Sequence, residues 1–301
     1  MGNLGLKGKK ILVTGGSGYL GGHLILKLLK EGARIGSIDV RDTNSNPEVK
    51  TYQLDLNDTR SLNETVQEFN PDIVYHLAAS LNRNRDFSIS EEVLNINLIG
   101  TVNLLNALRE VDYENFVFAS TSEVYGGIKS SKPIKEDDNF IPASPYSLSK
   151  YCAEMAIKTH GNIYSKNYTI MRLFNFYGED MSNSFFLPEL VSKLKKNVDF
   201  DMTLGEQVRD YIHLNDVIEA LTLAADEKAN QQTFNVCSGD GKSLRELAMM
   251  FKRIIKSNSE INFGALPYRK NEVWNMVGDN SKIKKVLGWQ PKIKIESDFE
   301  K

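Results

Sequence analysis

A glycine-rich turn near the N-terminus is the feature that most constrains how this chain can fold. The apolar run 11–14 leads into Gly15, Gly18 and Gly21, and an apolar segment resumes directly after them. This order predicts a buried strand, a tight turn and a helix that starts close to the strand, because glycine lets the two backbones approach. Backbone N–H groups at the start of such a helix can bind the oxygens of a pyrophosphate. The position of the glycines between a strand and a helix gives weight to a spacing that is common by chance.

An acidic residue closes the next expected strand. The segment 35–39 ends at Asp39, about twenty residues beyond the glycines, which is where dinucleotide-binding folds hold the adenosine ribose. A carboxylate there accepts hydrogen bonds from the ribose hydroxyls and repels a 2′-phosphate, so it favours NAD over NADP. Arg41 argues in the other direction. A turn-forming role at the strand end is the alternative for Asp39.

Up to residue 173, apolar segments alternate with helical patterns. Strands are expected at 11–14, 35–39, 51–54, 73–76, 116–120 and 169–173, and helices at 19–31, 59–69, 90–111 and 145–165. Strands separated by helices of this length predict βαβ units, and strands that are apolar throughout predict burial on both faces. The fold class is therefore α/β, a Rossmann-type doubly wound parallel sheet.

The pattern loosens after residue 173. Helices are expected at 186–196, 215–226, 243–255 and 281–287, with short strand-like pieces between them. We expect a dinucleotide-binding domain at 1–173 and a smaller C-terminal α/β lobe at 174–301, with some chain returning to the first domain. Ligands of doubly wound folds bind at the carboxyl ends of the strands, where such a lobe would sit.

Composition excludes several classes of protein. The 301 residues carry a net charge of −2, which gives no sign of a nucleic-acid or anionic-membrane partner. The two cysteines lie far apart and the four histidines show no ligand spacing, so neither a disulfide framework nor a metal site is indicated. Neither a signal peptide nor an apolar run of membrane-spanning length is present in the sequence. We expect the cytoplasm as the compartment.

A tyrosine and a lysine have the spacing of a catalytic pair. Tyr146 and Lys150 stand at i and i+4, so on a helix they share a face. An ammonium group beside a phenol favours the phenolate and lowers its pKa toward neutrality, where it can exchange a proton with a substrate hydroxyl. The hydroxyl of Thr121, after the strand 116–120, could bind the same substrate oxygen. The alternative for Thr121 is a turn or helix-cap role.

A series of short motifs extends over most of the chain. In order, they are the Gly15/Gly18/Gly21 turn, Asp55-Leu56, His76-Leu77-Ala78-Ala79, Asn97-x-x-Gly100-Thr101, Ser120-Thr121-Ser122-Glu123-Val124-Tyr125-Gly126, Tyr146-x-x-x-Lys150, Arg172-Leu173-Phe174-Asn175-x-Tyr177-Gly178, Arg209-Asp210-Tyr211-Ile212-His213 and Leu287-Gly288-Trp289. Each motif is weak alone. Together, in this order, they resemble the extended short-chain dehydrogenase/reductase family, in its NAD-dependent nucleotide-sugar epimerase/dehydratase group.

The resemblance implies a role for each matching residue. Tyr146 would be the general base, Lys150 would orient the nicotinamide ribose and lower the tyrosine pKa, and Thr121 would hold the sugar 4-hydroxyl. It implies a cofactor site made of Gly15, Gly18, Tyr19, Leu20, Gly21, Asp39, Asp55, Leu56, Leu77, Ala78, Ala79, Asn97, Tyr146 and Lys150, and a substrate site made of Ser122, Asn175, Arg209, Arg269 and Glu272. The alternative for Arg269 and Glu272 is a surface ion pair. By the same resemblance, His76 and His213 are structural.

Glu123 distinguishes the possible net reactions. A glutamate at this position removes the C5 proton in sugar-nucleotide 4,6-dehydratases, and Thr-Ser-Glu resembles the guanosine-diphosphate-mannose dehydratases and the uridine-diphosphate-glucuronate decarboxylases. Ser122 replaces the aspartate that other dehydratases place before it, and Asp39 favours NAD. We therefore favour a C4 dehydrogenase, reductase or epimerase of surface-polysaccharide sugar biosynthesis, with a dehydratase or decarboxylase using Glu123 as the alternative. A non-catalytic dinucleotide-binding regulator is the remote alternative.

The resemblance also implies partners. The substrate would be a nucleotide-diphosphate sugar, with guanosine as the guessed base. A homodimer would form through a four-helix bundle of the helices near 90–111 and 145–165. Ala153, Ala156 and Ile157 could supply the apolar strip of that interface or could equally belong to the core.

Overall fold

A seven-stranded parallel sheet forms the centre of the molecule. The computed structural model describes residues 5–41, 46–126, 132–269 and 271–299. The strand order is β10-β6-β5-β4-β1-β2-β3, and every neighbouring pair is parallel. Their bounds are β1 Lys10–Thr14, β2 Arg34–Asp39, β3 Val49–Gln53, β4 Ile73–His76, β5 Asn115–Thr121, β6 Tyr168–Leu173 and β10 Gln232–Val236. The predicted Rossmann-type α/β fold is confirmed.

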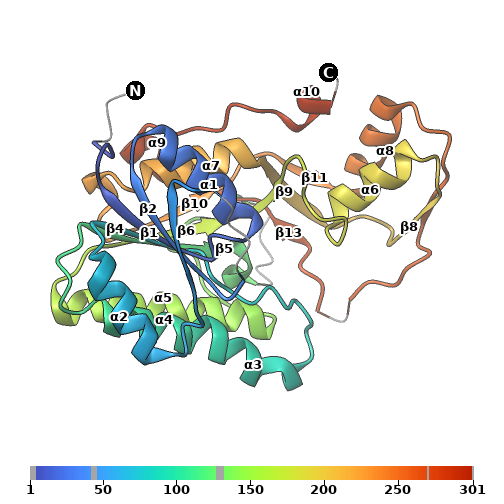
Figure 1. Cartoon of the computed structure of the whole chain (residues 1–301). Coiled ribbons are helices and arrows are strands. Elements are labelled where there is room, and N and C mark those ends of the chain that lie inside the picture. Colours follow the sequence, from blue (N-terminus) through green and yellow to red (C-terminus); the bar gives the residue numbers. More distant parts are fainter. Residues whose placement is uncertain (1–4, 42–45, 127–131, 270, 300–301) are drawn as a thin grey trace.

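Helices cover both faces of this sheet (Figure 1). One layer contains α2, α4 and α5, and the opposite layer contains α1, α7 and α9. Their bounds are α1 Tyr19–Lys30, α2 Thr59–Phe69, α4 Gly100–Ala107, α5 Pro145–Tyr164, α7 Leu214–Leu223 and α9 Ser281–Leu287. Each interface between sheet and helices holds its own apolar cluster, so the strands are buried on both sides, as their unbroken apolar runs predict.

The helix expected at 90–111 is not a single α-helix. After η1 (Phe87–Ile89), the chain forms α3 (Ser90–Leu94), a π-helical stretch η2 (Asn95–Ile99) and then α4. The wider π-turn accompanies a buried polar contact, because the Asn97 amide donates to the Ser80 carbonyl at 3.2 Å and to the Ser149 hydroxyl at 2.9 Å. The apolar periodicity of the sequence does not predict such a contact.

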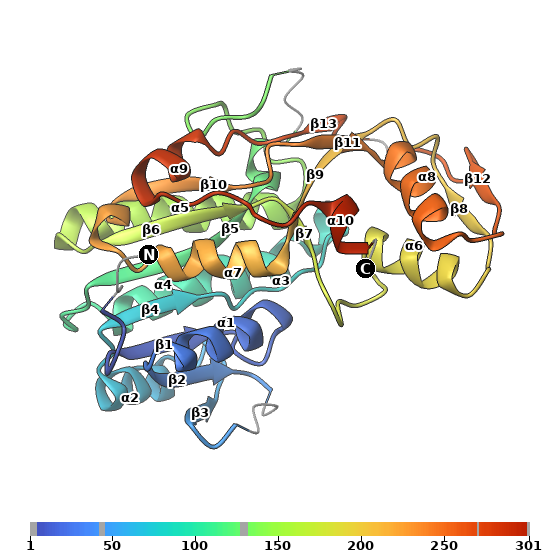
Figure 2. The same ribbon diagram turned by 90° about the horizontal axis from the view of Figure 1, so that it is seen from above.

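The chain after residue 173 contributes to two regions. The helices α7 and α9 and the strand β10 pack with the central sheet, whereas a cluster at one end of the molecule forms a smaller lobe (Figure 2). That lobe contains α6 Phe186–Lys195, α8 Leu244–Ile255, α10 Ile295–Phe299 and the parallel pair β8 Phe200–Met202 and β12 Ile261–Phe263. A small sheet of β7 Asn175–Tyr177, β9 Val208–His213, β11 Gly241–Ser243 and β13 Asn275–Met276 connects the two regions, and the short turns η3 Ser122–Tyr125 and η4 Glu227–Ala229 complete the elements.

Two of the residues suggested for a dimer strip lie in the core of the single chain. Ala153 and Ile157 on α5 are fully enclosed in the apolar cluster between the sheet and α4.

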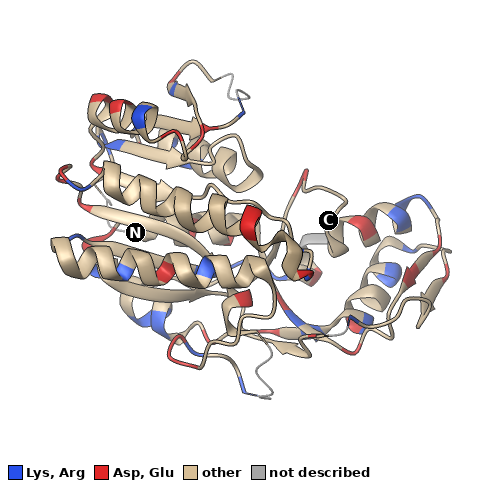
Figure 3. Cartoon of the chain, turned by 90° about the horizontal axis from the view of Figure 1, so that it is seen from below, with Lys and Arg blue, Asp and Glu red and all other residues tan. Residues whose placement is uncertain are grey.

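Acidic and basic positions are interspersed along the ribbon (Figure 3). None of the described helices is both long and apolar enough for a membrane span.

Candidate active site

A cavity of 970 Å³ runs along the carboxyl ends of the central strands and reaches the smaller lobe. It brings together residues that the sequence places far apart. The predicted site residues that line it are Gly15, Gly18, Tyr19, Leu20, Gly21, Asp39, Asp55, Leu56, Leu77, Ala78, Ala79, Thr121, Ser122, Glu123, Tyr146, Lys150, Asn175, Arg209 and Arg269. Asn97 and Glu272 are not among its lining residues.

The glycine turn forms a cradle that leaves no space for side chains. Gly15 has a φ of +75°, and a Cβ there would stand 2.7 Å from the Ala78 nitrogen. A Cβ on Gly21 would stand 2.2 Å from the Gly15 carbonyl oxygen. Helix α1 begins directly after Gly18, which as N-cap offers no side-chain hydrogen bond to the first turn. Its exposed N–H groups and positive end suit a phosphate group.

Asp39 lies at the end of β2, beside this cradle. Its carboxylate accepts hydrogen bonds from the Ser17 N–H at 3.1 Å and from the Arg41 N–H at 3.0 Å. The Arg41 side chain folds back to the same carboxylate, with Nε 3.3 Å from Oδ1. Arg41, the residue that argued for NADP, is thus an ion-pair partner of Asp39.

Helix α5 places the tyrosine and lysine at the cavity wall. Ser144 caps the helix through a reciprocal hydrogen-bond pair with Ser147, and Pro145 occupies the first turn, where it needs no N–H partner. Tyr146 and Lys150 follow on the face turned to the end of β5, where Thr121 accepts a hydrogen bond from the Glu123 N–H at 3.2 Å. Only 4% of Tyr146 and 3% of Lys150 is exposed.

Burial controls the ionisation of this pair. It raises the pKa of Tyr146 to about 12, against the opposing effects of Arg83 and Thr121. It lowers the pKa of Lys150 to about 7, and the ammonium lies 4.3 Å from the centre of the Phe118 ring. The direction for Tyr146 is the reverse of the one expected from Lys150 alone, because desolvation of the phenol outweighs the effects of Arg83 and Thr121.

A buried ion pair supports the wall from behind. Arg172 on β6 donates from Nε and Nη2 to the two carboxylate oxygens of Glu154 on α5, at 3.0 and 2.7 Å. Glu154 also accepts a hydrogen bond from Ser120 at 2.5 Å, and Arg172 donates to the Tyr125 hydroxyl at 2.8 Å. Because Ser120 precedes the turn η3 and Tyr125 ends it, these contacts fix the turn that carries Glu123. Sequence reasoning missed this pair, although a charged residue within the apolar strand β6 was a usable signal.

Two cavity arginines were also missed. Arg83 and Arg85 lie on the irregular segment between β4 and η1. The Arg83 Nε lies 3.5 Å from a Glu123 carboxylate oxygen, and Arg85 donates to the carbonyl of Asn271. The segment has no periodicity or known motif, so nothing in the sequence indicated that its arginines turn inward.

Glu272 and Asn97 support the cavity from outside it. The Glu272 carboxylate accepts a hydrogen bond from Arg209 at 2.9 Å and so holds the guanidinium, which itself lines the cavity. Asn97 accepts a hydrogen bond from the Ser80 N–H at 2.7 Å and fixes the segment after β4. His76 lies between the Thr14 and Thr101 hydroxyls, and burial lowers its pKa to about 3, which keeps it neutral.

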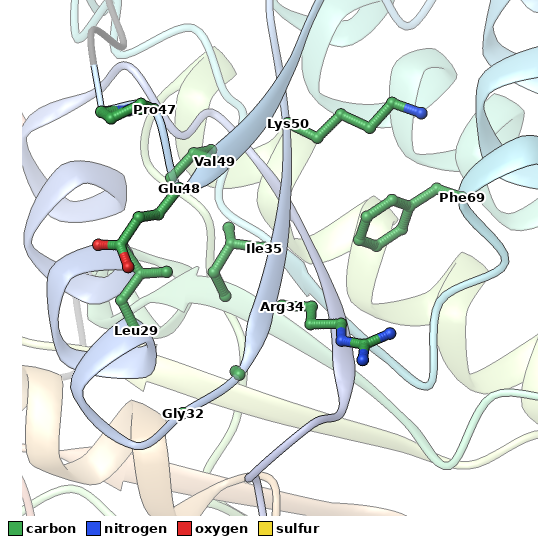
Figure 4. Close-up of a pocket in the computed structure, with 10 residues that line it drawn as sticks. Leu29, Gly32, Arg34, Ile35, Pro47, Glu48, Val49, Lys50 and Phe69 are labelled. Atoms are coloured by element: carbon green, nitrogen blue, oxygen red, sulfur yellow. The ribbon is translucent and has the colours of Figure 1, made fainter.

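A second hollow lies at the sheet edge formed by β2 and β3, away from these residues (Figure 4). It measures 690 Å³, and its lining includes Leu29, Arg34, Ile35, Lys50 and Phe69. None of the predicted site residues belongs to it. Within the described ranges, no cluster of histidine, cysteine or acidic side chains could hold a metal ion.

Comparison with known sequences places the chain in a family. The profile of the family described as GDP-mannose 4,6 dehydratase matches residues 12–301. A putative UDP-glucose 4-epimerase of Methanocaldococcus jannaschii is 30% identical over 97% of this chain and 96% of its own length. A GDP-6-deoxy-D-talose 4-dehydrogenase of Aggregatibacter actinomycetemcomitans is 29% identical over 93% of this chain and 91% of its own length.

Solved structures agree with that placement. The UDP-glucose 4-epimerase of Thermotoga maritima, determined with UDP-glucose, superposes with a TM-score of 0.90 at 28% identity, over 97% of this chain and 96% of its own. The Thermus thermophilus UDP-glucose 4-epimerase in complex with NAD gives a TM-score of 0.85 at 27% identity, over 97% and 96% of the two chains. With its fold, glycine cradle and Tyr146/Lys150 wall, this chain belongs to the GDP-mannose 4,6-dehydratase family of nucleotide-sugar epimerases and dehydratases.

Proposed function

We propose that this protein is an NAD(H)-dependent enzyme that transfers hydride at C4 of a nucleotide-diphosphate sugar, as a C4 dehydrogenase, reductase or epimerase. The observation that supports this most directly is the convergence of Thr121, Tyr146 and Lys150 beside the glycine cradle in one cavity. The relatives include both 4-epimerases and a 4-dehydrogenase, and these enzymes share chemistry at C4.

The residues present fit NAD. Gly15, Gly18 and Gly21 line the cavity without side chains, so a phosphate group could approach their backbone closely, and Asp39 lies at the strand end suited to the adenosine ribose. Asp55, Leu77 and Ala79 line the same stretch of cavity. When bound, oxidised nicotinamide accepts the hydride that leaves C4 of the sugar.

Tyr146 would receive the proton of the sugar 4-hydroxyl at its phenol oxygen. The C4–H bond would break with both electrons leaving as hydride, the 4-hydroxyl would give its proton to the tyrosinate oxygen of Tyr146, and the electron pair of the broken O–H bond would form the carbonyl double bond at C4. Thr121 would share the hydrogen bond to the same oxygen. Arg209 and Arg269 would hold the diphosphate, because a planar guanidinium binds two phosphate oxygens at once, and Asn175 and Ser122 line the same cavity.

A 4,6-dehydratase or a decarboxylase is the second candidate. Glu123 lines the cavity and is the carboxylate that such an enzyme would use at C5. One of its carboxylate oxygens lies 3.5 Å from the Arg83 Nε. A non-catalytic regulator is a weaker candidate, because the three groups that the proposed chemistry would use all line the cavity.

The finer assignments extend this proposal. We infer a cytoplasmic enzyme of surface-polysaccharide sugar synthesis that works as a homodimer through the outer faces of α3, α4 and α5. Guanosine as the base rests on the resemblance of the Thr121-Ser122-Glu123 motif. A uridine base is supported by the relatives named as UDP-glucose epimerases.

The test is mass spectrometry of nucleotide sugars incubated with the protein and NAD. The panel contains hexoses linked to guanosine, uridine, thymidine and cytidine diphosphates. We expect loss of two hydrogens from one substrate, or an isomer of unchanged mass that appears at a new retention time. Loss of water would instead assign the chain to the dehydratases with Glu123 as base, and loss of carbon dioxide would assign it to the decarboxylases. An unchanged panel would remove the enzyme proposal.

A further inference from the structure

We propose that Arg83 is a positioning residue for Tyr146, a second cation that is held over the phenol by Glu123 and shares with Lys150 the stabilisation of the tyrosinate. This inference rests on the proposed function, in which Tyr146 is the base. It assigns Glu123 to the anchoring of Arg83 rather than to proton removal at C5.

The geometry surrounds the Arg83 guanidinium on three sides. Its central carbon lies 5.7 Å from the centre of the Tyr146 ring and 5.4 Å from the centre of the Phe185 ring. Its Nε lies 3.5 Å from the Glu123 carboxylate. Phe185 is the N-cap of α6 in the smaller lobe, so Arg83 extends from the segment after β4 across the cavity to both walls. A guanidinium between two aromatic faces and a carboxylate is held rather than merely exposed.

The position and the pKa of Lys150 allow a second cation to act on the phenol. Its ammonium is directed at the Phe118 ring, 4.3 Å from the ring centre, and burial lowers its pKa to about 7. Near neutral pH, Lys150 is therefore charged only part of the time. Arginine stays protonated throughout this range, so the positive charge of Arg83 beside the phenol is permanent.

The charged side chains that line the same cavity as Tyr146 come from several elements. Lys150 lies on its own helix, Glu123 on η3, Arg83 on the segment after β4 and Arg209 on β9. Arg83 lowers the pKa of Tyr146 both by its charge and by hydrogen bonding, whereas Glu123 raises that pKa by its charge. Glu123 therefore contributes to the base only through the cation that it holds. Arg209 forms an ion pair with Glu272, with 2.9 Å between Nη2 and a carboxylate oxygen.

The test is the pH profile of kcat for sugar oxidation by the NAD-loaded enzyme. Proton removal needs the phenolate, so kcat rises with pH through the apparent pKa of Tyr146. In Arg83→Met the acidic limb should move to higher pH by about one unit, since an opposite charge this close shifts a pKa by roughly one to three units and the side chain is partly exposed. Below the limb, kcat should fall about tenfold while KM for the nucleotide sugar changes little.

Three further variants sharpen the result. Arg83→Lys keeps the charge, so the acidic limb should lie close to its wild-type pH. Arg60→Met, at an exposed position on α2, should match the wild type. Glu123→Gln should retain turnover. The acidic limb of its kcat profile should move from the wild-type position by less than it does in Arg83→Met.

Several outcomes would overturn the inference. A limb that stays in place in Arg83→Met would do so, as would an increase in KM at unchanged kcat, which would make Arg83 a substrate contact only. Loss of all turnover in Glu123→Gln would make Glu123 a base. If Tyr146→Phe turned over as fast as the wild type, the proposed function would fail. The Arg83 inference alone would fail if Tyr146→Phe were inactive but the acidic limb of Arg83→Met stayed at its wild-type pH.

Discussion

Arg172 and Glu154 form an ion pair with two parallel hydrogen bonds, at 3.0 and 2.7 Å, and neither side chain has more than 1% of its surface exposed. The pair joins β6 to α5 directly behind the wall that carries Tyr146. Burial of two opposite charges costs desolvation, and the loss of either partner leaves the other charged and unpaired.

Removal of one partner should therefore destabilise the protein strongly. Arg172→Met or Glu154→Gln alone should lower the free energy of unfolding by about 3 to 5 kcal/mol, and the double variant should lose less than the sum. Urea denaturation measures each value. The control is Arg60→Met, which breaks the exposed pair of Arg60 and Glu64 on α2 and should have almost no effect. Additive losses in the double variant would show that the two side chains do not act as a pair.

The glycine cradle should tolerate no methyl group at Gly21. A Cβ there would stand 2.2 Å from the Gly15 carbonyl, so Gly21→Ala should cost about 1 to 3 kcal/mol and weaken NAD binding. Gly22 is the matched control on the same helix, because its Cβ would meet only the Gly16 carbonyl at 3.9 Å. Gly22→Ala should be neutral or stabilising by up to about 1 kcal/mol. Denaturation measures the free energy of unfolding and calorimetric titration measures NAD affinity. Equal values for the two variants would contradict the close approach of Gly21 to the Gly15 carbonyl.

Tyr146→Phe should remove the base and leave the fold intact. The variant should lose about 10²- to 10⁴-fold in kcat, the usual range for general acid–base groups, with thermal stability and NAD affinity close to wild type. Tyr164→Phe, in the last turn of the same helix, is the control and should keep full activity. A variant that binds no NAD would mean that the phenol is part of the structure rather than the chemistry.

The buried ammonium of Lys150 should lower the stability of the folded protein. Its folded pKa is about 7 against an ordinary value of 10.5, so between these limits the unfolded chain binds more protons and wild-type stability rises with pH. Lys150→Met avoids the buried charge, and at or below about pH 7 its Tm should exceed that of the wild type by roughly 3 to 6 °C. The difference should shrink as the pH approaches 10.5.

Thermal unfolding at several pH values tests this expectation. Lys195→Met, at an exposed position on α6, should show no pH-dependent gain. A lower Tm of Lys150→Met at neutral pH would mean that neighbouring charges, Glu154 first among them, stabilise the ammonium more than burial penalises it.

The sequence by itself determined the parts of this protein that depend on near neighbours in the chain. The apolar runs of β1 and β4, the glycine turn before α1 and the Tyr146/Lys150 spacing on α5 each follow from local periodicity or local sterics. The alternation of strands and helices then fixed the parallel sheet, and the rule for the carboxyl ends of parallel strands located the cavity. The interrupted helix around η2 was not predicted at this level, and it coincides with a hydrogen bond of Asn97 to Ser149, a residue far along the chain.

The tertiary structure alone decided which charges meet and what they do to one another. Arg83 faces Glu123, Arg172 faces Glu154, and Glu272 stands behind Arg209, each pair joining segments far apart in sequence. No local pattern encodes such pairs, because they depend on which crossover brings which loop over the sheet. The same holds for the reversed pKa direction of Tyr146, since desolvation is a property of the packed site and not of the spacing between two residues.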